Sequence, residues 1–243
     1  MKKIAMVFLV TIFTVASGFC ETKSEPAARL FFDYSFAQTN IELQESYLMW
    51  DELESAITNN AGFNIEFPIS RCVYLETGIR LNSVHSKVKI DTEYDGIVYP
   101  NGLDEPGESI LVKYDGDALL KYIFLALPLK GKIKHKKTGL YLVAGVQAGY
   151  LLKASYDGEY HMSQTVSGDS YSYKHQFDED IKSDSENINF SYLLGAGIEI
   201  NVGNLPCFAQ VIYDHGLTDL EKRQSYPELK TKMLNFGFGF FFN

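Results

Sequence analysis

The chain has 243 residues, of which 46% are hydrophobic and 14% aromatic, and its formal charge is −9. This acidic balance argues against nucleic acid as a partner, because domains that bind phosphate backbones are basic. Beyond the N-terminal segment, no stretch approaches the roughly 18 apolar residues that a membrane-spanning helix needs. We therefore expect a chain that is either soluble or crosses a membrane as a closed sheet.

The N-terminus has the features of a secretory signal peptide. Lys2 and Lys3 precede a short apolar stretch over residues 4–16, and small residues follow it. We expect a signal peptide over residues 1–20 and one mature domain over residues 21–243. Removal of the two lysines takes the formal charge from −9 to −11.

Three cysteines are present, and the first lies near the expected cleavage site. Phe19 precedes Cys20, where a lipoprotein signal needs a small residue, so lipidation of Cys20 is not expected. Exported proteins can form disulfides. However, Cys72 and Cys207 fall on opposite side-chain parities of strands that are not neighbours, which predicts two free thiols.

The clearest pattern is an alternation of side chains with period two, which is typical of strands. In the tail TKMLNFGFGFFFN, the alternate residues from Leu234 to Phe242 are apolar, whereas Asn235, Gly237 and Gly239 are small or polar. Scanning for the same pattern predicts eight strands, over residues 30–38, 62–69, 72–84, 119–132, 140–152, 188–202, 206–217 and 231–243.

The connections between these strands alternate in length. The joints near residues 70–71, 135–138 and 203–205 are short, and those near 39–61, 85–118, 153–187 and 218–230 are long. Transmembrane barrels combine short periplasmic turns with longer external loops. We therefore predict an all-β fold: an eight-stranded antiparallel up-and-down transmembrane β-barrel with short periplasmic turns and long acidic external loops.

Eight strands enclose a lumen that side chains can fill, and closure leaves no unpaired edge in lipid. The polar face combines glycines with charged and amide residues, which we expect to point inward: Glu66, Glu76, Arg80, Lys130, Gln147, Glu199 and Asp214. A soluble lipocalin-like barrel would place the apolar face inside instead. Glycines on the polar face, and charges of both signs there, favour the transmembrane alternative.

One segment also resembles a known family. Residues 122–152, YIFLALPLKGKIKHKKTGLYLVAGVQAGYLL, resemble the outer-membrane β-barrel family of the PorT-like type, found in Bacteroidota and related bacteria. LLGAGIEI within 190–202 and the YDHGLTD segment from Tyr213 are similar to the later strands of that family. The resemblance implies an eight-stranded outer-membrane barrel without defined catalytic residues. PorT itself resembles a component of type IX protein secretion, but no motif singles out that role here.

No residue set predicts catalysis. The Asp214-His215 pair is similar to the Asp–His pair of omptin proteases, but adjacent strand residues point to opposite faces. We therefore expect a lumen aspartate and a rim histidine. The five histidines show no ligand spacing, and no serine lies in a nucleophile elbow. We predict no enzyme activity, no catalytic, cofactor-binding or metal site residues, and no cofactor.

Two of the long connections are acidic. Residues 91–118 contain eight Asp or Glu and one Lys, and 153–187 contain eight and three. Such carboxylates suit Ca²⁺, but without a ligand motif a solvated charged surface is the preferred interpretation. The tyrosines of the second connection either form a ligand surface or extend its hairpin: Tyr156, Tyr160, Tyr171 and Tyr173.

Two further segments allow alternatives. The lysines around residues 135–138 either meet phospholipid head groups at a periplasmic rim or remain solvated: Lys130, Lys132, Lys134, Lys136 and Lys137. Residues 41–57 form either an amphipathic helix over the barrel mouth, with Trp50 at the membrane interface, or an irregular loop.

The sequence therefore predicts a non-enzymatic protein of a Gram-negative outer membrane, with a structural, surface-interaction or envelope and secretion-support role. The expected partners are outer-membrane lipid, the barrel assembly machinery during biogenesis, and an envelope or secretion protein, with the chain itself a monomer. The alternatives are a soluble periplasmic lipocalin-like barrel that binds a ligand and, third, a barrel-embedded enzyme acting on lipids or peptides.

Overall fold

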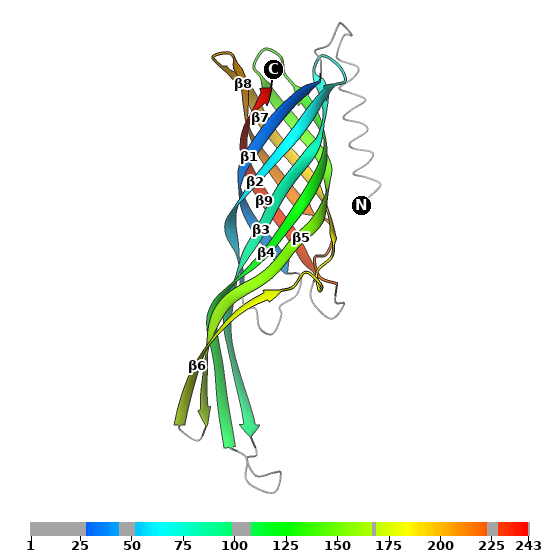
Figure 1. The fold of residues 1–243 in the computed structure, drawn as a ribbon. Helices are drawn as coiled ribbons and strands as arrows, with labels where there is room; N and C mark the ends of the chain where they lie inside the picture. Colours follow the sequence, from blue (N-terminus) through cyan, green and yellow to red (C-terminus); the bar gives the residue numbers. More distant parts are fainter. Residues whose placement is uncertain (1–27, 44–51, 99–107, 167–168, 223–227, 243) are drawn as a thin grey trace.

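The computed structural model describes residues 28–43, 52–98, 108–166, 169–222 and 228–242 (Figure 1). The expected signal peptide over residues 1–20 lies outside this part of the chain. All regular elements of the described residues are strands. They are β1 (Arg29–Leu43), β2 (Glu52–Pro68), β3 (Val73–Val98), β4 (Glu108–Lys134), β5 (Leu140–Val166), β6 (Asp169–Asp180), β7 (Ile188–Val202), β8 (Leu205–Gly216) and β9 (Leu229–Phe242).

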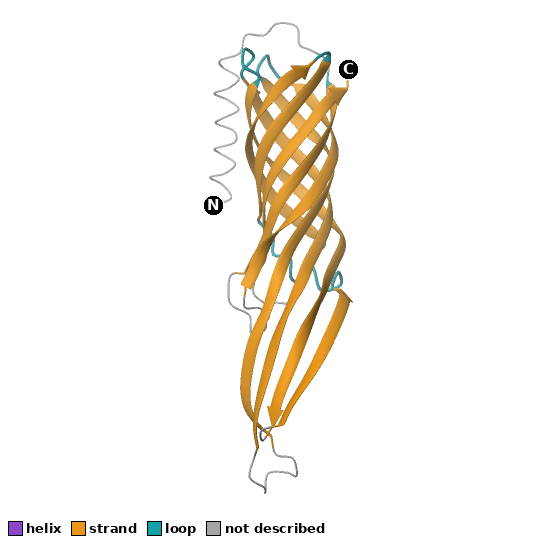
Figure 2. Ribbon diagram, turned by 90° about the vertical axis from the view of Figure 1, so that its left-hand side faces the viewer, coloured by secondary structure: helices purple, strands orange, loops and turns teal. Residues whose placement is uncertain are grey.

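Eight of these strands close into a ring. The sheet order is β4-β3-β2-β1-β9-β8-β7-β5-β6, and β4 also pairs with β5. Every pairing is antiparallel. The ring leaves out only β6, so the predicted eight-stranded barrel is confirmed, with β6 as a ninth strand outside it. Figures 1 and 2 show the tilted strands of this barrel.

The three short turns lie together at one end, called here the turn end (Figure 1). Two of them contain a glycine in the left-handed region, Gly139 with φ 73° and Gly203 with φ 64°. Glycine adopts this conformation without a steric cost, which allows the strands to reverse tightly. The longer connections lie at the opposite, far end, as the alternation of connection lengths predicts.

At the far end, several strands continue well beyond the ring. β3 and β4 remain paired out to Val98↔Glu108, and β4 and β5 out to Ile110↔Val166. β6 pairs with the outer part of β5, from Ser155 to Val166. β2 stops pairing with β3 at Lys89. We call the resulting four-stranded structure, made of residues 90–98, 108–117, 155–166 and 169–180, the projecting sheet (Figure 2).

The projecting sheet corrects the expectation of long loops. Residues 85–118 and 153–187 form mainly strands, and the tyrosines expected there lie on the extended hairpin of β5 and β6. Both alternatives for residues 41–57, an amphipathic helix and an irregular loop, are wrong for the residues described there. Residues 41–43 belong to β1 and residues 52–57 to β2, paired with β9 and β3, whereas residues 44–51 lie outside the described part.

The wall of the barrel is apolar outside and polar inside. On β9, Phe236, Phe238 and Phe242 are exposed on the outer side, whereas Asn235 and Thr231 are buried on the inner side. On β4, Leu125, Leu127 and Leu129 point outward, whereas Lys130 and Lys132 are buried. The predicted strand faces are therefore confirmed. A soluble lipocalin-like barrel requires the inverse arrangement, so that alternative is inconsistent with the structure.

Candidate functional site

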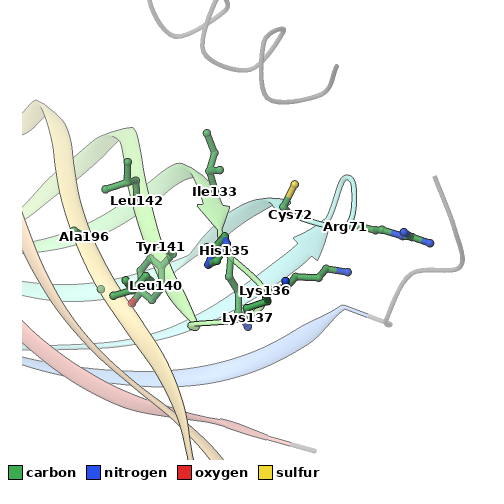
Figure 3. A pocket seen from close by; sticks show the side chains of 12 residues that line it. Arg71, Cys72, Ile133, His135, Lys136, Lys137, Leu140, Tyr141, Leu142 and Ala196 are labelled. Atoms are coloured by element: carbon green, nitrogen blue, oxygen red, sulfur yellow. The ribbon is translucent and has the colours of Figure 1, made fainter. Parts of the chain in front are cut away.

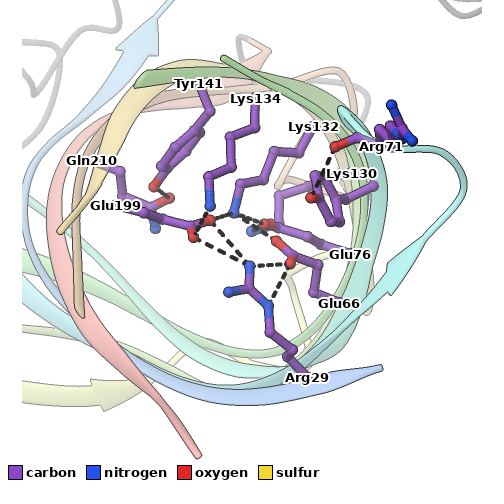
Figure 4. Close-up of polar contacts among 11 residues, drawn as sticks. Arg29, Glu66, Arg71, Glu76, Lys130, Lys132, Lys134, Tyr141, Glu199 and Gln210 are labelled. Atoms are coloured by element: carbon purple, nitrogen blue, oxygen red, sulfur yellow. Dashed lines mark hydrogen bonds and ion pairs between the residues drawn. The ribbon is translucent and has the colours of Figure 1, made fainter. Parts of the chain in front are cut away.

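The charged side chains of the lumen gather at the turn end and come from five strands (Figure 4). We call this set the charged cluster. It consists of Arg29 on β1, Glu66 on β2, Glu76 on β3, Lys130, Lys132 and Lys134 on β4, and Glu199 on β7. The alternation of each strand directs these residues inward, whereas their sequence neighbours face outward.

Glu66 is one centre of the charged cluster and is only 1% exposed. The Nε of Arg29 donates a hydrogen bond of 3.0 Å to Glu66 Oε1, and the Arg29 guanidinium makes a second, shorter contact with the same oxygen. Lys132 Nζ donates to Glu66 Oε2 at 2.6 Å. Both carboxylate oxygens are therefore satisfied by cations, as burial of a charge requires.

Glu199 forms the second centre and connects β7 with β4 and β1, neither of which is its neighbour in the ring. Lys132 Nζ lies 2.5 Å from Glu199 Oε1, and a guanidinium nitrogen of Arg29 lies 3.2 Å from Oε2. Lys134 also donates to Glu199. Glu76 pairs with Lys130 at 2.8 Å and with Lys132 at 3.3 Å. Four cations therefore share three carboxylates.

Aromatic rings surround the charged cluster. The Arg29 guanidinium carbon is 4.0 Å from the centre of the Phe241 ring, and Lys132 Nζ is 4.3 Å from that of Tyr141. Phe31, Phe208 and Phe241 pack against one another at centroid distances of 5.2–5.6 Å. Cation–π contacts of this kind gain strength when water is excluded, so the rings add to the stability of the cluster.

A second polar layer lies next to the charged cluster. Arg80 is 3.3 Å from Asp33 Oδ2 and donates to Ser35 at 3.2 Å. Asn64 donates to the other Asp33 oxygen at 2.9 Å. In the same way, Asn60 donates to Asn235 at 2.9 Å. These bonds connect β1, β2, β3 and β9 through the interior.

Toward the far end, the interior becomes apolar. Buried side chains from β1, β3, β4, β5 and β9 and from the β8–β9 connection meet in one cluster, called here the apolar plug. Tyr122 and Leu120 are each 1% exposed, and Leu151 is fully buried. The other members include Val84, Val88, Phe124, Leu220, Leu229 and Met233.

Charged cluster, polar layer and apolar plug together fill the lumen. In the charged cluster, Glu66, Glu76, Lys130 and Lys132 are at most 4% exposed, whereas Arg29 and Lys134 at the turn end are 26% and 17% exposed. An eight-stranded barrel is narrow enough for its own side chains to occupy the interior. The arrangement therefore gives a rigid, closed wall rather than a channel.

The structure places every predicted lumen residue inside the barrel. Glu66, Glu76, Arg80, Lys130 and Glu199 belong to the network just described, and Gln147 donates to Asp214 at 3.2 Å.

His215 points outward beside the rings of Tyr213 and Tyr192. Asp214 and His215 therefore do not converge, as predicted from their adjacency.

Two expectations about the turn end are wrong. Lys130 is buried as expected for the inward set, but Lys132 is buried in the lumen as well instead of lying at the rim, and only Lys136 and Lys137 are exposed at the turn. Cys72 is disulfide-bonded, so the prediction of two free thiols is correct only for Cys207.

Two parts of the interior were not predicted. Arg29 lies one residue before the expected first strand, although it has the same parity as Phe31 and Asp33 and could have been found from that. The apolar plug gives no such signal, because its residues alternate with equally apolar outward residues. In β5 a bulge at Leu152 inserts one extra residue and so changes which parity faces inward. Leu151 before the bulge and Ala154 after it are therefore both buried.

A cavity of about 980 Å³ lies on the outside of the barrel at the turn end (Figure 3). Its basic side is formed by the turn between β4 and β5 with Lys136 and Lys137, together with Arg71. Its apolar side includes Leu140 and Leu142, which are exposed on the outer wall. The cavity therefore combines positive charge with a surface continuous with the apolar wall.

Within the described residues, no group of three or more His, Cys, Asp or Glu side chains is arranged to hold a metal ion. No helix among the same residues is long and apolar enough to cross a membrane.

A closed antiparallel ring with apolar residues outside and a hydrogen-bonded polar interior is the architecture of a transmembrane β-barrel. The sequence matches the family described as outer membrane protein beta-barrel domain over residues 28–222. The chain belongs to this family and is an outer-membrane β-barrel protein.

The chain is also similar to several solved structures. The attachment invasion locus protein Ail of Yersinia pestis is 11% identical, with 89% of this chain and 100% of that chain covered and a TM-score of 0.39. Neisserial surface protein A is 10% identical, with 89% and 100% covered and a TM-score of 0.38. OprG of Pseudomonas aeruginosa is 10% identical, with 92% and 100% covered and a TM-score of 0.32. No curated protein matches the chain.

Proposed function

We propose that this protein is a non-enzymatic outer-membrane barrel that holds the projecting sheet outside the cell for contact with a surface or envelope partner. The observation that carries the proposal is the continuity of β3, β4 and β5, which run from the wall of the barrel into the projecting sheet. The barrel is the anchor, and the projecting sheet is the part available to a partner.

The orientation follows from the two ends of the barrel. Barrels of bacterial outer membranes have short periplasmic turns and longer external segments. On this basis, the turn end faces the periplasm and the projecting sheet faces the exterior. The secretory signal expected over residues 1–20 agrees with export across the inner membrane.

The filled lumen supports a role that does not depend on transport or catalysis. Ion pairs join β4 to β7 and β1 to β7 across the interior, and the apolar plug occupies the far end. An enzyme built into the barrel would need convergent polar groups at that far end. Inside the barrel at that end, the described residues form the apolar plug instead, which favours a structural and interactive role.

Outer-membrane lipid is the first partner we propose. The outer wall offers exposed phenylalanine and leucine side chains to acyl chains. The cavity beside Lys136 and Lys137 adds positive charge at the level where phosphate groups of the periplasmic leaflet would lie. Assembly machinery is the second partner, since a newly exported barrel chain needs help to close in the membrane. The chain then functions as a monomer, because the ring closes within one copy.

The PorT-like resemblance remains a finer part of the proposal. Most of the residues that carry it lie on β4, the basic turn and β5, and all three lysines of the charged cluster are on β4. On the basis of this resemblance, the partner would be a protein of the cell envelope or of a secretion system.

Impermeant thiol labelling in intact cells tests the orientation. A cysteine introduced by Ser172→Cys on β6 should react with a charged maleimide in intact cells, because Ser172 is exposed on the projecting sheet. A matched Lys136→Cys variant at the turn end should react only after the cells are lysed. The reverse pattern would contradict the proposed orientation, and the unmodified chain provides the background from Cys207.

Photo-cross-linking tests the interactive role. A cross-linking residue at Tyr173, exposed on β6, should capture a protein partner, whereas one at Phe238 on the outer wall should capture only lipid or assembly factors. Purification of the complexes would then identify the partner. A lack of specific adducts from several positions of the projecting sheet would contradict the proposal.

A further inference from the structure

The projecting sheet has one aromatic face and one charged face. The pairings place Tyr160 of β5 opposite Gly116 of β4 and His175 of β6, and Tyr156 opposite Glu179. Because side chains alternate along a strand, the residues between them, such as Asp157 and Glu159, belong to the other face. On that face Lys174 pairs with Glu159 at 2.7 Å, and Lys121, at the base of the sheet, pairs with Asp157 at 2.9 Å.

The rings of the aromatic face touch in sequence across the strands. Tyr114 and Tyr160 meet edge to face at a centroid distance of 5.7 Å, and Tyr160 lies 6.1 Å from Phe177. Tyr156 lies 4.7 Å from Phe177. Such contacts hold the rings in place, so the face is ordered before any ligand arrives.

These rings enclose a small cavity of about 190 Å³ just beyond the apolar plug. Gly116 and Gly158 lie on the same face as these rings, and the neighbouring strand packs directly against both of them, with Tyr160 against Gly116 and Ala118 against Gly158. The residues that line the cavity are Ile90, Tyr114, Tyr156, Tyr160, His175, Phe177 and Glu179.

The residues that line the cavity favour a positively charged ligand. Four of its side chains are Tyr or Phe rings and one is the carboxylate of Glu179, while neither lysine nor arginine occurs among the described lining residues. The face of an aromatic ring attracts a cation, and several rings together form the cage that recognises quaternary ammonium groups. A carboxylate at the same cavity adds long-range attraction for a positive ligand.

We propose that this cavity, called here the aromatic cage, binds an organic cation of choline size through its quaternary ammonium group. A quaternary ammonium group is covered by methyl groups and is only weakly hydrated, so it loses little hydration free energy on entering a site lined by aromatic rings. The location on the projecting sheet makes the cage accessible from the surroundings rather than from the lumen. This inference concerns a ligand site and stands independently of the partner proposed for the projecting sheet.

Binding of choline to the full-length mature chain in maltoside detergent tests the proposal, because this detergent has no ammonium group of its own. Titration calorimetry should show saturable binding of choline. The neutral isostere 3,3-dimethylbutan-1-ol, which has the same shape without the charge, should bind at least about tenfold more weakly. Choline should also shift the NMR signals of the tyrosine and phenylalanine rings in the unmodified protein.

Variants locate the site. Phe177→Leu, which keeps an apolar side chain but removes the ring, and Glu179→Gln should each weaken choline binding by about fivefold or more. Two controls on β6 should leave it unchanged: Tyr171→Leu, on the same face but outside the cage, and Asp178→Asn, on the other face. Folding of each variant is checked by heat-modifiable gel mobility. The proposal is overturned by equal binding of the neutral isostere, by absence of saturable choline binding, or by equal effects of cage and control variants.

Discussion

Lys132 of β4 reaches Glu199 of β7 across the interior of the barrel, with Nζ 2.5 Å from Oε1. The same ammonium group also contacts Glu66 and Glu76, so one lysine compensates carboxylates from three other strands. The strands that these residues connect are not all neighbours in the ring. The contact therefore links strands that share no backbone hydrogen bonds with each other, such as β4 and β7.

Removal of Lys132 should destabilise the barrel strongly. Lys132→Met leaves three buried carboxylates with fewer cations, and breaking one side of a buried pair typically costs about 3–5 kcal/mol. Urea unfolding of the refolded protein in detergent measures this loss of unfolding free energy. Adding Glu199→Gln to the variant should recover part of it, because the uncompensated charge is reduced. Lys136→Met, at the exposed turn, is the control and should change stability little.

A charge on the outer wall should also be costly, with an effect that depends on depth. Phe238 lies in the middle of the outward residues of β9, and Phe242 lies near the turn end. Phe238→Arg should cost about 2–4 kcal/mol in lipid, whereas Phe242→Arg should cost about 0–1 kcal/mol. Unfolding from lipid vesicles measures both. Equal effects at the two positions would contradict a lipid-facing wall.

The apolar plug should behave as a packed core. Leu151 is fully buried, and Leu151→Ala should reduce the unfolding free energy by about 2–5 kcal/mol. Leu152→Ala is the matched control, because Leu152 is the next residue and is 40% exposed on the outside. Thermal unfolding in detergent, followed by gel mobility, compares them. A larger effect of the control would indicate that the far end is not closed by packing.

The Glu159–Lys174 pair on the projecting sheet gives a prediction for pH. Hydrogen bonds from Lys174 and Gln176 lower the pKa of the Glu159 carboxyl below its usual 4.5. Because the pKa is lowered in the folded state, the pair stabilises the sheet at pH values above the pKa of Glu159 in the unfolded chain. This stabilisation is lost as the pH falls through the pKa of Glu159 in the folded chain.

NMR titration of the Glu159 carboxyl measures this pKa, and Lys174→Gln should raise it. Lys121→Gln is the control, because Lys121 pairs with Asp157 instead and should leave the Glu159 pKa close to its value in the unmodified chain. An unchanged pKa after Lys174→Gln would show that the pair does not form in solution.

Much of the barrel could be predicted from sequence because one physical rule governs it. Outward residues meet an apolar surface and inward residues meet one another, so the period of two is clear on β7 and β9. The inward parity of Glu66, Glu76, Lys130 and Glu199 identified four of the seven residues of the charged cluster in advance. The pairing of the glutamates with particular lysines depends on strand register, which the alternation alone does not determine.

The projecting sheet could not be predicted in the same way. Its strands have acidic residues on one face, and these residues made the segments look like solvated loops. The tyrosines of these strands do follow a period of two: Tyr94, Tyr114, Tyr156 and Tyr160. Because the residues between them are charged, the segments resemble solvated loops in sequence and not strands. In β5 the bulge beside Leu152 further shifts the phase between barrel and sheet.

The uninterrupted course of β4 from Glu108 to Lys134 has a mechanical consequence. A partner that pulls on the tip of the projecting sheet pulls along the strand axis, and the ladder hydrogen bonds to β3 and β5 lie across that axis. Many hydrogen bonds then carry the force together in shear, and they do not break one after another. A tether of this design resists detachment along its length, while β6, held by β5 alone, can be peeled from the side without opening the ring.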